Sequence, residues 1–417
     1  MNFTHSRSQA GFTLIELMVA LLLGVVLTSG VISVFITSRT SYSLNNAVGQ
    51  VQEGGRFAMS TMQPVVSQAG YTGCANQTFS GTYANDLNNP TGGPVYEFGE
   101  PVYGFEFTGT GPGTTIKDTT GTPVLDGNAS DWSPNLTSDV TTAIGGYVVK
   151  NSDILLVHEQ LGNPAVVLSP YVNTTTKAIP AYASTTTAAL SAGDIAIVSN
   201  CNDFTPFQIS NSTVSPGASG IVNFANSGTP GNSGNFTAKY TNDSQVAAAQ
   251  TYIFFVGKSS VDGGYSLFEA SLTADTGSAA GNGLMKASSV REIVPGVENM
   301  QVLYGKMVQI TSTQPAVYVP AGYETAAQVD SDQAAWIASG HTCPSYNCPW
   351  NEVIAVRIAL VVRSDDNSIP KEQMPTAATS IQVMGVASGD SVNYYPFLDR
   401  RLHRYFIETI SLRNSMR

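Results

Sequence analysis

The sequence predicts an α+β protein, in which a long amino-terminal α-helix packs on an antiparallel, β-rich head with long loop inserts. Glu16 is the only charged residue between Arg7 and Arg39, so residues 12–36 form an apolar stretch. A membrane-spanning helix needs roughly 20 such residues. Beyond this stretch, apolar residues recur at helical spacing, and after them come short apolar runs separated by loops rich in Gly, Pro, Thr and Asn. We therefore expect a leader over residues 1–11, a helix over 12–63 and a head over 64–417.

The composition narrows the class of protein. Only 12% of the 417 residues are charged, compared with roughly 25% in an average soluble domain. This low charge and the 39 Gly residues are typical of an exported, loop-rich protein more than of a cytosolic enzyme. The net charge of -11 argues against a broad nucleic-acid footprint.

The order of segments at the amino terminus differs from that of an ordinary secretory signal. A secretory signal carries its cleavage site after the apolar stretch, whereas here the small residue Gly11 precedes it. Cleavage after Gly11 would leave the apolar helix attached to the mature protein. A carboxylate inside such a helix costs at least about 2.5 kcal/mol, so Glu16 requires a partner. The alternative is an ordinary signal anchor with an isolated glutamate.

The segment G-F-T-L-I-E-L-M-V-A, which begins at Gly11, resembles the class III signal of type IV pilins and pseudopilins. The resemblance implies that a prepilin peptidase cleaves after Gly11 and that the new first residue, Phe12, is N-methylated. It also implies an assembly role for Glu16, which would pair with the terminal ammonium group of a neighbouring subunit. Opposite charges attract strongly in a low dielectric.

Helical spacing continues beyond the apolar stretch, which predicts a stalk with one apolar face. We expect Pro64 to end or kink the helix near Gln63, because proline lacks a backbone donor. Glycines at 24, 30, 49, 54 and 55 weaken the helix locally. The apolar face is formed by Leu44, Val48, Val51, Ala58 and Met62.

Three segments of the chain resemble the PilW branch of minor pilins. They are G-R-F-A with A-G-Y-T-G-C within residues 53–74, R-E-I-V-P-G-V-E-N-M-Q-V-L-Y-G at 291–305, and R-R-L-H-R-Y-F-I-E-T-I-S-L-R-N at 400–414. We expect strands near residues 102–108, 153–158, 194–200, 251–258, 265–270, 297–304, 353–363 and 381–386. Two inserts are expected near 211–242 and 306–351, the first too polar to bury much.

The chain has four cysteines, which allow more than one pairing. We favour a Cys343–Cys348 disulfide, because it closes a short loop flanked by prolines, and a Cys74–Cys201 disulfide, which would tie the stalk to the head. A zinc site is the alternative. It is disfavoured because structural zinc sites usually have two tight ligand pairs, and His341 is the only histidine nearby.

No catalytic constellation, cofactor site or metal site is expected. Nucleotide and esterase motifs are absent, and no two of His158, His341 and His403 have the i, i+4 spacing of a zincin. The pairs Asp330/Asp332 and Asp365/Asp366 could bind calcium but lack EF-hand spacing, so solvated loops are favoured.

Aromatic residues near the carboxy terminus lie beside several arginines. We expect them to pack in the core, with a nucleic-acid stacking platform as the alternative. They are Tyr394, Tyr395, Phe397, Tyr405 and Phe406.

The resemblance implies a PilW-type minor pilin, a structural protein and not an enzyme. Such a subunit belongs to an initiation or tip complex that primes pilus assembly, supports twitching motility and presents an adhesin. Its partners would be the prepilin peptidase, other minor pilins, the major pilin, a tip adhesin and the inner membrane, with the head in the periplasm and the subunit incorporated into the pilus. The alternatives are a minor pseudopilin of type II secretion, and a membrane-anchored adhesin or binding protein whose inserts hold a ligand site.

Overall fold

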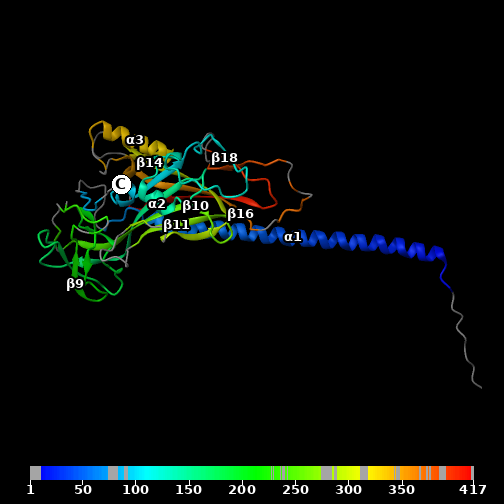
Figure 1. Cartoon of the computed structure of the whole chain (residues 1–417), viewed down its shortest axis with the longest axis horizontal. Helices are drawn as coiled ribbons and strands as arrows, with labels where there is room; N and C mark the ends of the chain where they lie inside the picture. The colour runs from blue at the N-terminus through cyan, green and yellow to red at the C-terminus, as the bar shows by residue number, and fades with distance from the viewer. Residues whose placement is uncertain are drawn as a thin grey trace, which may run out of the picture.

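The computed structural model has one long helix that projects from a β-rich head (Figure 1). This arrangement confirms the predicted α+β class. The structure describes residues 11–73, 83–88, 93–226, 228, 230–234, 236, 240–241, 243–273, 284–285, 289–309, 318–341, 343, 348–365, 368–371, 374, 377–384 and 391–414.

Helix α1 spans Leu14–Gln68 and is 55 residues long. It therefore runs through Pro64, whereas the sequence predicts an end or kink near Gln63. The last turn is held by tertiary packing, because Val66 and Ala69 are completely buried in the head. Burial of apolar side chains compensates for the backbone hydrogen bond that Pro64 cannot donate.

The larger sheet is organised around two long antiparallel strands, β4 (Ile154–Val167) and β10 (Gln245–Lys258). One half of β10 also pairs with β11 (Tyr265–Thr273), and its other half with β6 (Ile195–Ser199). The strands that the sequence predicts near 251–258 and 265–270 are therefore present, and they form an antiparallel pair. Because β4 and β10 are long, they carry the sheet from the main core near α1 into a second lobe at the opposite end of the head (Figure 1).

The remaining strands of this sheet are β1 (Val102–Phe107), β3 (Trp132–Ser133), β5 (Ala178–Tyr182), β7 (Phe204–Gln208), β8 (Asn211–Ser212), β9 (Ser219–Asn223), β12 (Leu284–Met285) and β13 (Arg291–Pro295). Helix α2 (Ser138–Ile144) buries Val140, Ala143 and Ile144 in the main core.

The second lobe contains the first predicted insert, and the expectation that residues 211–242 bury little is wrong. Phe224, Phe236 and Tyr240 from this segment are buried, and they pack with Phe207 of β7. Strand β9 pairs with β5, which makes the segment part of the sheet. The segment is polar on average, but its few aromatic residues form a small core of their own.

A second sheet has the strand order β15 (Tyr318–Glu324), β14 (Val297–Gln309), β16 (Val353–Arg363) and β19 (His403–Ser411). A third sheet, formed by β17 (Ile381–Val383), β18 (Val392–Tyr395) and β2 (Thr115–Lys117), packs on it through Tyr394, Val361 and their neighbours. The predicted insert at 306–351 contributes β15 and helix α3 (Ala326–Ala338).

Buried polar groups join the two main sheets. The Asp153 carboxylate accepts hydrogen bonds from the backbone N–H of Phe107 at 3.1 Å and of Val302 at 2.9 Å. Beside it, the Ser152 hydroxyl accepts from the backbone N–H of Met300 at 3.0 Å. Burial is the main reason that the pKa of Asp153 lies well above its usual range. The carboxyl group thus links β1 to β14, and the free energy needed to remove it from water opposes part of this stabilisation.

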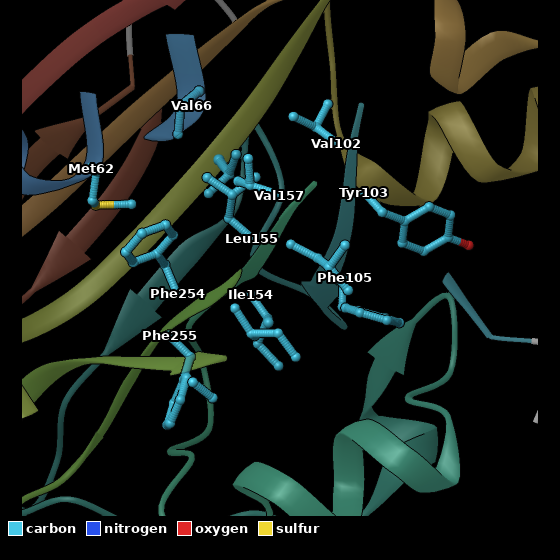
Figure 2. Packing of buried hydrophobic residues seen from close by; sticks show 14 of the residues in the cluster. Met62, Val66, Val102, Tyr103, Phe105, Ile154, Leu155, Val157, Phe254 and Phe255 are labelled. Carbon is cyan, nitrogen blue, oxygen red and sulfur yellow. The ribbon is translucent and has the colours of Figure 1, made fainter. Parts of the chain in front are cut away.

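The carboxy-terminal half of α1 lies across β19, β16, β13 and β4. Figure 2 shows Met62 and Val66 of α1 directed at Leu155 and Val157 of β4. The buried face of α1 consists of Ala47, Val51, Gly55, Ala58, Met59, Met62 and Val66. The predicted face is confirmed at Val51, Ala58 and Met62, whereas Leu44 is exposed because it lies before the head begins.

The carboxy-terminal residues after β19 close the end of α1. The Asn414 side chain donates to the carbonyl groups of Gln68 at 3.1 Å and Ala69 at 3.3 Å, and the backbone N–H of Arg413 donates to Ser67. The last carbonyl groups of a helix have no partner within the helix. The L-R-N sequence at 412–414 therefore acts as a cap for α1.

Gly55 allows close contact between α1 and β19. A Cβ atom at residue 55 would lie 2.3 Å from the Phe406 ring, whereas nothing lies within 4 Å of a Cβ atom at Gly49. We expect Gly55→Ala to lower the free energy of unfolding of the detergent-solubilised chain by about 1–3 kcal/mol, because the ring must move. Gly49→Ala should leave it unchanged or raise it by up to about 1 kcal/mol, the gain in helix propensity. Urea unfolding of both variants tests this, and equal effects would contradict the proposed contact.

Glu100 lies under α3 and accepts a hydrogen bond from Gln333 at 2.7 Å. Burial, with a smaller contribution from the Glu97 charge, raises its pKa to about 8. Because the folded pKa exceeds the unfolded value, stability should fall as the pH rises from about 4.5 to about 8. Glu100→Gln keeps the acceptor without the charge. In urea unfolding it should match wild type near pH 4.5 and exceed it at pH 9, by up to about 4 kcal/mol. An equal pH dependence in both proteins would contradict this assignment.

Candidate assembly site on the amino-terminal helix

The junction expected to be cleaved is exposed and lies outside the helix. Gly11, Phe12 and Thr13 precede the first helical residue, Leu14, and Phe12 is 89% exposed. The segment is thus accessible, and Thr13 has an extended backbone conformation. The rest of the expected leader, residues 1–10, lies outside the described residues.

Glu16 caps its own helix. Its Oε2 atom accepts hydrogen bonds from the Thr13 backbone N–H at 3.2 Å and from the Thr13 hydroxyl at 3.1 Å. In return, the Thr13 hydroxyl accepts from the Glu16 backbone N–H at 3.4 Å. This is a capping box, which the T-L-I-E spacing could have revealed in the sequence. Both bonds use Oε2, and within the described part of the chain Glu16 forms no ion pair.

The apolar half of α1 is exposed along its whole length. From Phe12 to Ile36 the large apolar side chains are all more than half exposed. Among the described residues, α1 is the one helix long and apolar enough to cross a membrane. Figure 1 shows this half extending away from the head. An exposed apolar surface of this length requires a lipid or protein environment.

A shallow depression runs along α1 next to Glu16. Small residues Ala20, Gly24 and Thr28 follow Glu16 at intervals of four, so they lie on one side of the helix. Small residues at this spacing allow a second helix to approach closely within a membrane. Phe12, Leu17, Leu21 and Val25 form the rest of the depression.

The structure contains the Cys343–Cys348 disulfide, with a Cα–Cα distance of 5.8 Å, as the sequence predicts. Cys201 also takes part in a disulfide. Cys74, its expected partner, lies outside the described residues, so the Cys74–Cys201 pairing stays a prediction. The zinc alternative for Cys343 and Cys348 is excluded, because these thiols are oxidised.

Asp330 and Asp332 are used in other contacts. Asp330 accepts a hydrogen bond from the Tyr103 hydroxyl at 2.7 Å, and Asp332 forms an ion pair with Lys306 at 2.5 Å. No group of three metal-binding side chains exists among the described residues. Asp366 lies outside them.

The carboxy-terminal aromatics do not form a common surface. Tyr394 is buried, Phe406 packs against α1 at Gly55, and Tyr405 is half exposed on the opposite side of β19. His158 is buried, where desolvation lowers its pKa to about 3, and it bonds Thr251 at 3.0 Å. His403 lies 3.4 Å from buried Glu298. Core packing is therefore confirmed for Tyr394 and wrong for Tyr405, while Tyr395, Phe397 and Phe406 are half-buried.

Comparison with known families gives two matches. Residues 253–414 match the family described as Type IV Pilus-assembly protein W, and residues 6–32 match the prokaryotic N-terminal methylation motif. The first match runs from β10 to Asn414, and the second contains Gly11, Phe12 and Glu16. Both confirm the resemblance that the sequence indicates. No curated protein and no solved structure matches the chain.

Proposed function

We propose that this chain is a type IV pilin of the PilW type, and that it is a minor pilin, a structural subunit of the complex that primes pilus assembly at the tip. The matches to the PilW family model and to the N-terminal methylation motif support this proposal. The observation that carries this proposal is the exposed apolar half of α1, which begins at an acid without a cationic partner among the described residues. The helix serves as the membrane anchor before assembly and as the contact with other pilins afterwards. The head then lies in the periplasm.

The partner of Glu16 is the terminal ammonium group of a neighbouring pilin. The capping box occupies Oε2 and leaves Oε1 without a hydrogen bond from any residue that the structure describes. Glu16 can therefore keep its cap and accept an ammonium group at the same time. In a low dielectric this pair offsets part of the cost of burying both charges. The depression at Ala20 and Gly24 gives the neighbouring helix space to reach it.

The second lobe and α3 lie at the end of the head farthest from the anchor (Figure 1). In a tip complex this end faces away from the membrane. It is thus suited to present an adhesin, or to bind a ligand itself. A minor pseudopilin of type II secretion would share the anchor, and loss of secretion without loss of piliation on deletion would favour that alternative.

The Glu16→Gln substitution tests the charge of Glu16 separately from its role in the helix cap. Glutamine also forms a capping box, but it cannot pair with an ammonium group. We expect both Glu16→Gln and Glu16→Ala to be processed normally. The amount of other pilins that co-purify should fall by about tenfold or more, which corresponds to a loss of about 1.4 kcal/mol in binding free energy. Glu53→Ala, at an exposed position of the same helix, is the control. Normal piliation and normal co-purification of the Glu16 variants would sink the proposal.

The leader can be tested by intact-mass measurement of the membrane-extracted protein. We expect the mature chain to begin at Phe12, with the additional mass of one methyl group, because the methylation motif spans this junction. Replacement of Gly11 by a bulky residue should retain residues 1–11. A wild-type protein that keeps these residues would overturn the assignment.

A further inference from the structure

We propose that the outer edge of β19 binds an extended strand from a different pilin subunit, which adds to the β15-β14-β16-β19 sheet. This inference rests on the proposed function, because it identifies the surface of the head that meets a neighbour. It concerns the head, whereas Glu16 concerns the membrane helix. The two contacts can therefore be tested separately.

The backbone of β19 has one paired edge and one open edge. Its register with β16 is continuous from Ala355↔Ser411 to Arg363↔His403, and within the described chain β16 is its sole strand partner. The bonds at its two ends, from Leu412 N–H to Ile354 and from Ser364 N–H to Leu402, show that even-numbered residues face β16. The N–H and C=O groups of Tyr405, Ile407 and Thr409 consequently point outward.

Proteins protect open edges with Pro, charged side chains, bulges or covering segments. Among the described residues, β19 has no proline or bulge, and β17 lies close to it without pairing with it. Its charged side chains, Arg404 and Glu408, alternate with the outward-pointing backbone positions and lie on the same face as Phe406. Strand β19 reads H-R-Y-F-I-E-T-I-S and pairs with β16 without a register shift. Tyr405 is 50% exposed and Ile407 is 40% exposed, both on the face away from α1. An open edge with exposed apolar side chains at alternate positions fits an added strand with apolar residues at matching positions.

The direction of β19 indicates which strand can add. Phe406 lies at Gly55, and Arg413 bonds Ser67, so β19 runs alongside α1 and in the same direction. An antiparallel pair of two β19 edges would direct the two anchors oppositely. Subunits that share one membrane have parallel anchors. The edge is thus suited to a segment of another subunit and not to a symmetric pair of copies.

Proline at residue 407 tests the edge with little effect on the head. Proline is tolerated on an edge strand where its N–H would face outward. Ile407→Pro should therefore keep the melting temperature of the head near that of wild type while blocking strand addition. Ile407→Ala removes the side chain and keeps the backbone donor. Ile407→Lys leaves the backbone unchanged and adds a charge that protects the edge.

The readout is site-specific photo-crosslinking of the full-length protein in cells that assemble pili, with benzoylphenylalanine in place of Tyr405. We expect an adduct with an extended segment of a second protein that carries a class III signal. Ile407→Pro and Ile407→Lys should lower its yield by about tenfold, and Ile407→Ala by less than about threefold. An unchanged yield in Ile407→Pro and Ile407→Lys would overturn the inference. So would an adduct formed only with a second copy of this chain.

Co-purification of other pilins with the same variants separates this inference from the proposed function. If pilins co-purify in a Glu16-dependent manner and the Tyr405 adduct is missing, the β19 edge is not an interface and the minor-pilin assignment stands. If pilins fail to co-purify with wild type, the proposed function itself fails.

Discussion

The contact between α1 and β19 joins the two ends of the described chain, and the position of the head relative to the membrane helix depends on it. Gly55 lets the Phe406 ring approach the helix axis, and Asn414 binds the last carbonyl groups of the helix. Between these two points, Met62 and Val66 are buried against the larger sheet. A force or displacement applied to the anchor is therefore transmitted to both main sheets through a packed surface.

The head itself is held together by polar groups as well as by apolar packing. Asp153 accepts hydrogen bonds from backbone groups of β1 and β14, so it holds strands of two different sheets in a fixed relative position. A buried carboxyl group is costly unless its oxygens have partners. The long strands β4 and β10 extend this framework into the second lobe, which has its own core of aromatic residues.

The sequence indicates much of this architecture because the spacing of apolar residues reflects which face of each helix or strand is buried. The run 353–363 is correctly predicted as a strand because all of its residues except Arg357 and Arg363 are apolar, and it is almost entirely buried in the structure. The end of α1 is missed because local chemistry at Pro64 is outweighed by the burial of Val66. The segment 211–242 is misjudged because a few aromatic residues determine its packing and its average polarity does not.

In the candidate interaction sites too, the sequence predicts some features and misses others. Glu16 is identified from the sequence because an acid in an apolar helix is anomalous wherever the chain folds. The open edge of β19 cannot be identified from the sequence, because an edge strand is recognised only when the order of strands in the sheet is known. The role of the L-R-N sequence likewise depends on contacts with residues far away in the chain.

The cap on α1 also has a consequence for biogenesis. Asn414 and Gln68, which it joins, are separated by 346 positions. Strand β19 and Asn414 are therefore synthesised long after α1. Until then, the apolar side chains of Met62 and Val66 lack part of the surface that surrounds them in the folded head. Contacts between such distant segments slow folding, and a chain truncated before β19 would leave the base of α1 exposed.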